Sequence, residues 1–326
     1  FIPEIGYDQA LLNFAFRALP VIIFFSSLIA VTYHLGIIQF VIKNISLLME
    51  KTMKTSGAET LSISANIFIG QTEAPILIRP YISLMTKSEL MAVMVGGFAT
   101  VAGSVMALYV TWLNNIPGIA GHLLAASVMS APAALMVAKI IYPETKQLKT
   151  IKPDKISLKS NDNNIVDAVG RGATEGLKLA ANVAAMLIAF ISMVAMINFV
   201  LGLLGTSMQE ILGLLFKPLA WTMGIPWKDA EIVGVLLGEK IVLTELIAFR
   251  DLSDYVAKNI LSERSIIITS YALCGFANFG SIGIQLGGIG SMAPERKKDL
   301  SRIVFKAMLG GAIASWLTAS IVGIII

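Results

Sequence analysis

The sequence is poor in the residues on which most soluble enzymes and metalloproteins depend. It has one cysteine, Cys274, among 326 residues, which excludes an internal disulfide framework and a cysteine-based metal site. His34 and His122 are the only histidines, so histidine-based metal or triad chemistry has little to build on. Charged residues make up 14% of the chain, against about 25% in ordinary soluble domains. No nucleophile–base pair or metal cluster is apparent, so we do not expect an enzyme.

What remains is strongly apolar. Hydrophobic residues make up 56% of the chain and the mean hydropathy is +0.78, so we expect a protein organised by the lipid bilayer. The net charge of +4 is small and lies in loops, which indicates membrane orientation and gives no reason to expect a nucleic-acid partner. The chain begins at Phe1 without a methionine, so we expect an N-terminal portion to precede it.

Six segments are apolar enough to cross a bilayer core, which needs about 20 residues in a helix. They are Ala10–Gly36, Ser88–Leu113, His122–Pro143, Thr174–Gly205, Ser265–Ile289 and Ile303–Ile326. The second and fifth are predicted to be interrupted, because glycine, β-branched and polar residues gather near their middles. Ile37–Lys54 and Ser207–Trp221 have the pattern of amphipathic helices at the two interfaces. The predicted fold class is an all-α membrane protein.

Two further segments, Ala58–Leu84 and Ala230–Tyr255, are apolar but broken. In the first, Gly70 and Pro75 leave halves of about 12 residues, or about 18 Å of helix, which is too short to cross. Two half-length helices joined by a polar tip form a re-entrant hairpin. Non-helical backbone at that depth is tolerated only inside protein or beside a watery cavity.

The basic residues lie in three loops. They are Lys43, Lys51 and Lys54, then Lys146, Lys149, Lys152, Lys155 and Lys159, and finally Arg296, Lys297, Lys298 and Arg302. The loop Asn114–Gly121 carries no charge. The positive-inside rule places the basic loops in the cytoplasm and both ends of the chain outside. The first hairpin then enters from the cytoplasm and the second from the outside.

An internal repeat divides the chain into residues 1–160 and 161–326. In each half an Ala-Glu pair is followed fourteen residues later by Thr-Glu, and later by Gly-Phe-Ala. These motifs start at Ala58, Thr72 and Gly97, and again at Ala230, Thr244 and Gly275. Each half is predicted to run span, interfacial helix, hairpin, interrupted span, span, with opposite membrane orientation. Inverted repeats with interrupted helices are typical of secondary transporters.

Glu73 and Glu245 stand at the two hairpin tips. An ionisable side chain at the bilayer centre costs roughly 2.5–3.5 kcal/mol. Each could merely cap a half-helix or pair with a buried cation such as Arg79 or Lys240. A functional role is favoured because Gln71 and other polar residues share the tips and because the repeat would bring both tips together.

The interrupted spans would add backbone carbonyls and helix ends that can face an ion or ligand. For Asn278 and Ser281 the alternative is helix–helix hydrogen bonding, worth about 0.6 kcal/mol. The neighbours Glu239 and Lys240 are expected to form an ion pair with each other.

Three motifs carry a family resemblance: "GQTEAP" at Gly70–Pro75, "TELIAF" at Thr244–Phe249 and "CGFANFGSIG" at Cys274–Gly283. The chain resembles the bacterial branch of the concentrative nucleoside transporters over essentially its whole length. That family often has Asn where Thr244 stands and Ser where Thr100 stands, and bacterial members usually carry two further spans before Ala10–Gly36.

The resemblance implies a multi-pass protein of the bacterial inner membrane that imports uridine-like nucleosides with sodium. It also implies a homotrimer and elevator-type movement of hairpins and interrupted spans. In this resemblance the nucleobase is bound by residues that correspond to Gln71, Thr72 and Glu73, and the ribose by residues that correspond to Glu245, Asn278 and Ser281. Val105 and Phe276 correspond to the apolar lining of the pocket. The sodium site corresponds to Asn66, Ile69, Thr100 and Val101. Two alternatives stay open: proton coupling through Glu73 or Glu245, and a non-transporting nucleoside sensor or gate of the same fold.

Overall fold

The computed structural model describes residues 19–146 and 162–326. Within these ranges the chain forms helices and connecting turns, without a β-strand. The predicted all-α fold class is therefore confirmed. The beginning of the first predicted span and the loop lysines Lys149, Lys152, Lys155 and Lys159 lie outside the described residues.

The described chain contains the following helices on either side of residue 160. The first half contains α2 (Leu19–His34), α3 (Ile37–Met53), α4 (Gly57–Ala65), η2 (Ala74–Ile78), α5 (Arg79–Ile82), α6 (Lys87–Ala99), α7 (Gly103–Trp112) and α8 (Ile119–Ile141). The second contains α9 (Ile165–Gly202), α10 (Met208–Thr222), α11 (Trp227–Val242), α12 (Glu245–Ala257), α13 (Glu263–Leu273), α14 (Phe279–Met292), η4 (Pro294–Arg296) and α15 (Lys297–Ile325).

Both predicted interruptions are present. The helix breaks at residues 100–102, between α6 and α7, and at residues 274–278, between α13 and α14. By length and composition, residues 87–112, 119–141 and 294–325 can each cross a membrane. Helices α2 and α3 meet at an angle of 74°, so α3 leaves the direction of the span before it, as an interfacial helix would. Helix α9 is 38 residues long.

The first hairpin differs from its prediction in its second arm. Its first arm, α4, begins with a capping box, in which Ser56 and Glu59 satisfy each other's backbone N–H groups. The second arm was expected to be one helix of about 12 residues, and is instead a 3₁₀ turn followed by the four-residue helix α5. Pro75 and Pro80 explain this, because each proline removes the N–H that a continuous α-helix would use.

The second hairpin has two regular arms, α11 and α12. They are separated at Leu243, whose backbone lies outside the helical region. Thr244 then caps α12 by accepting a hydrogen bond from the N–H of Leu246 at 3.0 Å. Glu245 therefore becomes the first residue of a helix, with its carboxylate near the positive end of the helix dipole.

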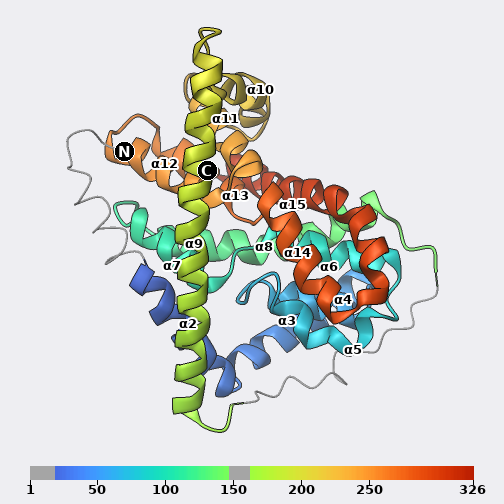
Figure 1. Cartoon of the computed structure of the whole chain (residues 1–326). Coiled ribbons are helices and arrows are strands. Elements are labelled where there is room, and N and C mark those ends of the chain that lie inside the picture. The colour runs from blue at the N-terminus through green and yellow to red at the C-terminus, as the bar shows by residue number, and fades with distance from the viewer. Residues whose placement is uncertain (1–18, 147–161) are drawn as a thin grey trace.

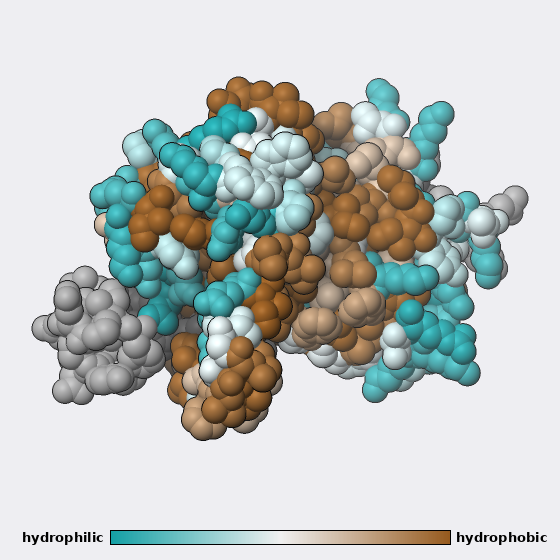
Figure 2. All heavy atoms as spheres, turned by 90° about the horizontal axis from the view of Figure 1, so that it is seen from above, coloured by the Kyte–Doolittle hydropathy of each residue, from teal (hydrophilic) through white to brown (hydrophobic). Residues whose placement is uncertain are grey.

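Helix α9 runs along the height of the molecule and passes beside α2 (Figure 1). Two glycines make this approach close. A Cβ at Gly172 would lie 2.7 Å from the Cα of Ser27, and one at Gly176 would lie 2.8 Å from the Cα of Ile23. Many large apolar side chains are exposed, such as Phe40 at 71%, and broad apolar areas appear beside polar ones on the face in Figure 2. Such exposure suits a lipid-facing surface.

Candidate functional site

The two interrupted spans touch each other at their breaks. Gly275 has a φ of +119°, and a Cβ there would lie 2.8 Å from the carbonyl oxygens of both Phe98 and Ala99. Glycine is therefore required at this position for both its conformation and its size. The first break is also tied to the first hairpin, because the N–H of Gly103 donates to the carbonyl of Phe68 at 3.0 Å.

A cavity of about 830 Å³ lies where the hairpin tips meet the interrupted spans. It is lined by all eight residues predicted to bind substrate, which are Gln71, Thr72, Glu73, Val105, Glu245, Phe276, Asn278 and Ser281. Of the four predicted sodium residues, Ile69 lines this cavity. The cavity is also lined by residues of α2 and α9, namely Ser26, Ile29, Tyr33, Arg171, Glu175 and Asn182. The volume is in the range of small-molecule sites.

The carboxylate of Glu245 is buried and held on both oxygens. The hydroxyl of Tyr109 donates to Oε1 at 3.0 Å, and Nδ2 of Asn278 donates to Oε2 at 2.8 Å. Asn278 in turn caps α14, because its Oδ1 accepts from the N–H of Ser281 at 2.8 Å. Two helix N-termini, those of α12 and α14, therefore converge on this carboxylate, and remaining lone pairs can accept ligand hydroxyls.

Tyr109 was not among the predicted site residues. It is 1% exposed and its ring stacks on that of Phe249 at 4.0 Å between centroids. In the sequence it reads as one more aromatic residue of an apolar helix. Nothing in the local pattern of α7 shows that its hydroxyl reaches a carboxylate 136 residues later.

Gln71 is held by two side chains of α14. Its Nε2 donates to Oγ of Ser281 at 3.2 Å, and its Oε1 accepts from Nε2 of Gln285 at 3.0 Å. Gln285 is fully buried and also donates to the carbonyl of Met94 at 3.1 Å. Gln285 was not predicted either, because a single glutamine inside an apolar helix gives no indication of its partner.

The other two tip residues lie differently. Oε2 of Glu73 accepts from the N–H of Gly70 at 3.0 Å, while the side chain stays exposed at the cavity. Thr72 packs on α14 at Gly288, where a Cβ would lie 2.8 Å from Cγ2 of the threonine. Among the described residues neither tip glutamate forms an ion pair with Arg79 or Lys240, so the ion-pair form of that alternative is wrong, whereas both glutamates do lie at the start of a helical segment.

Three of the predicted sodium residues lie deeper than the cavity. Asn66 ends α4, is 1% exposed, and its side-chain oxygen and nitrogen have no hydrogen-bond partner in the described part of the chain. Thr100 ends α6, and its hydroxyl donates to the carbonyl of Gly96 at 2.9 Å, which leaves its lone pairs available. The carbonyls of Ile69 and Val101 likewise accept no hydrogen bond there. Unpartnered buried oxygens of this kind fit a small cation.

The predicted ion pair between Glu239 and Lys240 is wrong. Neighbouring residues on a helix point in different directions, and Lys240 turns away toward α13 and α15. Its Nζ donates to the carbonyls of Ala272 and Cys274 and to Oγ of Ser315.

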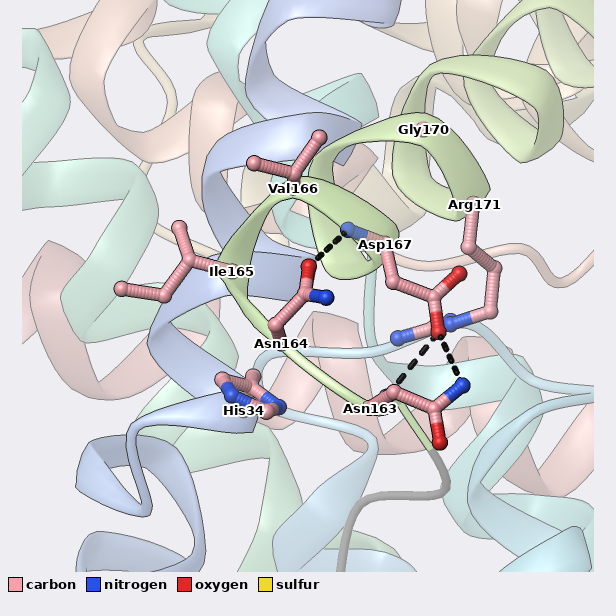
Figure 3. Close-up of a pocket in the computed structure, with 8 residues that line it drawn as sticks. All are labelled: His34, Asn163, Asn164, Ile165, Val166, Asp167, Gly170 and Arg171. Atoms are coloured by element: carbon pink, nitrogen blue, oxygen red, sulfur yellow. Dashed lines mark hydrogen bonds between the residues drawn. The ribbon is translucent and has the colours of Figure 1, made fainter.

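A second, more open cavity of about 990 Å³ lies at the N-terminus of α9 (Figure 3). Its polar groups already bond one another: Oδ2 of Asp167 accepts from Asn163 at 2.9 and 3.1 Å. Arg171 lines both cavities and pairs with Asp162 and Glu175. None of the residues predicted to bind substrate or sodium lines this second cavity.

The described residues thus form an all-α membrane protein in which hairpins and interrupted helices surround a polar central cavity. This is the architecture of secondary transporters. A family described as "Na+ dependent nucleoside transporter C-terminus" matches residues 122–323, and one described as "Nucleoside recognition" matches residues 15–116.

The chain is also similar to known transporters and to their solved structures. Sodium/nucleoside cotransporter 1 of Mus musculus is 45% identical over 98% of this chain and 52% of its own length. An uncharacterized transporter of Haemophilus influenzae is 44% identical over 96% of this chain and 76% of its own length. The solved structure of CNTnw in an inward-facing substrate-bound state superposes with a TM-score of 0.89, at 45% identity over 95% of this chain and 75% of that chain. A CNTnw variant in an outward-facing state gives 0.87 at 44% identity, over 95% and 74%.

The chain belongs to the concentrative nucleoside transporter family. It is a multi-pass membrane protein that spans about half the length of its mammalian relatives.

Proposed function

We propose that this protein imports nucleosides by symport with sodium. The observation that carries the proposal is the central cavity, where Glu245, Asn278 and Ser281 from one half meet Gln71 and Glu73 from the other. The lining offers carboxylate, amide and hydroxyl groups, whose chemistry is that of binding. We therefore infer a transporter and not an enzyme.

The lining suits a nucleoside because a nucleoside is neutral and rich in hydroxyl groups. A buried carboxylate is a strong acceptor for hydroxyls, so we assign the ribose to Glu245 with Asn278 and Ser281. An amide both donates and accepts, so we assign the base to Gln71, with Thr72 and Glu73 beside it. Val105 and Phe276 supply apolar walls.

We place the sodium ion between the first hairpin and the first break. The supporting observations are the unpartnered amide of Asn66, the free lone pairs of Thr100 and the free carbonyls of Ile69 and Val101. A cage of neutral oxygens binds a monovalent cation without adding buried negative charge. The N–H of Gly103 joins this region to the hairpin that carries Gln71, so an ion there would order the base-binding tip.

One sodium ion per nucleoside suffices energetically. Moving one charge through 100 mV gains about 2.3 kcal/mol, and a tenfold sodium gradient adds about 1.4 kcal/mol. The sum of about 3.7 kcal/mol supports roughly 500-fold accumulation at equilibrium.

We further propose that the protein works as a homotrimer in the bacterial inner membrane, with elevator movement and an inverted repeat across residues 1–160 and 161–326. The order of helices supports the repeat, the bacterial relatives support the membrane assignment, and the inward-facing and outward-facing structures of CNTnw support the movement. The trimer follows from the family resemblance.

The test is uptake of radiolabelled uridine into proteoliposomes, with an inward sodium gradient or with choline in its place. We expect uptake that depends on sodium and is competed by unlabelled nucleosides. Uptake that ignores sodium but collapses with the proton gradient would instead select proton coupling. Uridine binding without any uptake would select a sensor or gate.

A further inference from the structure

Lys240 is a buried cation for which the proposed transport cycle has no use. It lies on α11, in the same hairpin as Glu245, and its side chain is 0% exposed. Its Nζ donates to the carbonyl of Ala272 at 2.8 Å, to the carbonyl of Cys274 at 3.3 Å, and to Oγ of Ser315 at 2.9 Å. No carboxylate of the described chain lies within ion-pair distance of this nitrogen.

At hydrogen-bond distance the ammonium therefore meets neutral groups, while the carboxylate of Glu245 acts on its charge from beyond ion-pair distance. All three acceptors are neutral oxygens. One belongs to Ala272 in the last turn of α13 and one to Cys274 directly after it, at the negative end of the helix dipole. Ser315 donates its own proton to the carbonyl of Gly311 at 3.0 Å, so its oxygen is turned toward the ammonium. Carbonyls and a hydroxyl grouped in this way are what a monovalent metal ion would also use.

In the first half of the chain the residue four positions before the Thr-Glu pair is Phe68, where the second half has Lys240. Thr100 follows the end of α6 as Cys274 follows the end of α13, and both residues have an extended backbone conformation. The first hairpin carries the neutral amide of Asn66, and that amide has no partner in the described chain. The second hairpin carries the ammonium of Lys240.

We propose that Lys240 is a tethered cation, whose ammonium permanently fills a monovalent-cation site at the second break and fastens hairpin 2 to α13 and α15. The comparison with the first break rests on the proposed function, since it takes that break to hold sodium. The oxygen cage around Lys240 is described without that proposed function. Removing the side chain beyond Cβ should leave a vacant cage and stem channel that together accept a small alkylammonium ion from solution.

The experiment measures thermal unfolding of the purified protein in detergent, without nucleoside and at constant sodium. Lys240→Ala removes the three outer methylenes and the ammonium, a fragment that propylammonium replaces. We expect the midpoint of this variant to fall by several degrees, and propylammonium chloride to restore at least half of the loss. Propanol, which fills the space without charge, and tetramethylammonium, which is too large, should restore little.

Two further variants make the result decisive. Lys240→Met keeps most of the stem and blocks the cage, so its midpoint should also be low and should not respond to propylammonium. Lys217→Ala removes a lysine whose ion pair with Glu231 lies at the surface, so it should show no amine effect.

A wild-type midpoint for Lys240→Met, or rescue of Lys240→Ala by propanol as well as by propylammonium, would overturn the proposal. If Lys240→Ala cannot be purified, the Met variant decides alone, a low midpoint supporting the proposal and a wild-type one refuting it. Loss of sodium-dependent uptake in the wild type would refute the transport function and leave these thermal results intact.

Discussion

At the scale of single residues, the candidate site is a set of polar side chains that already hold one another. Tyr109 and Asn278 fix the carboxylate of Glu245, and Ser281 and Gln285 fix the amide of Gln71. A ligand would therefore meet groups whose rotamers are set, which lowers the entropy cost of binding.

The two tips should differ in what they discriminate. Glu245→Gln keeps the shape but loses charge-assisted hydrogen bonds of about 1.5–3 kcal/mol each, so affinity should fall roughly tenfold or more for every ribonucleoside. Gln71→Ala should instead change the ranking among bases. A competition panel of uridine, cytidine, adenosine and the 2′- and 3′-deoxyuridines on both variants measures this. The opposite pattern would show that base and sugar are assigned to the wrong tips.

Gln285 is expected to act through Gln71. It does not line the cavity, yet it donates to Oε1 of Gln71, so Gln285→Leu should free that amide to rotate. We expect weaker discrimination among bases, while the preference for ribose over deoxyribose is kept. The same competition panel checks it, and a change confined to the ribose preference would contradict this positioning role.

Asn66 gives a test of the sodium site. Its amide makes no hydrogen bond in the described chain, so Asn66→Leu should fold normally, and because it removes one oxygen from the cage it should weaken sodium-stimulated uptake. The measurement is uptake against sodium concentration, with gel filtration as the folding control. A variant with the sodium dependence of the wild type would place the ion elsewhere.

The residues that sequence reasoning identified are those carried by compact motifs. Gln71 and Asn278 each stand at a tip or a break that glycine or proline marks, and Glu245 belongs to the repeated Thr-Glu pair. Tyr109 and Gln285 lie inside regular apolar helices, and their function arises from partners 136 and 214 residues away. Such contacts depend on how the halves dock, which no local pattern records.

At the scale of elements, the breaks in α6–α7 and α13–α14 are predictable because weak helix formers cluster there. The second arm of the first hairpin was less predictable, because Pro80 as well as Pro75 prevents a continuous helix there. Packing then brings the two breaks into direct backbone contact at Gly275.

Gly275→Ala should therefore be severely destabilising. The added Cβ would meet two carbonyl oxygens at 2.8 Å, and alanine is strained at a φ of +119°. We expect a midpoint of thermal unfolding lower by several degrees, or loss of the folded protein. Gly283→Ala is the matched control, because a Cβ there meets nothing within 4 Å and alanine favours a helix. Equal behaviour of the two variants would mean that the breaks do not touch.

At the scale of the whole molecule, the predicted orientation can be tested by cysteine labelling. Cys274 is 1% exposed, so the wild-type chain serves as a nearly silent background. Asn115 and Lys146 are exposed and lie in the uncharged and basic loops. In intact cells a membrane-impermeant maleimide should label Asn115→Cys and reach Lys146→Cys only after permeabilisation. The reverse result would invert the orientation and refute the positive-inside assignment.

The contacts that complete the site also have a consequence for how long the protein takes to be made. Gln71 lies 210 and 214 residues before Ser281 and Gln285, its two partners. At about 5–20 residues per second, roughly 10 to 40 s of translation separate the first hairpin tip from the helix that will satisfy it. During that interval the side-chain amide of Gln71 lacks both of these partners, and burying it unpaired in lipid would be costly. The insertion machinery must therefore keep this hairpin in a wet environment until the last third of the chain has emerged.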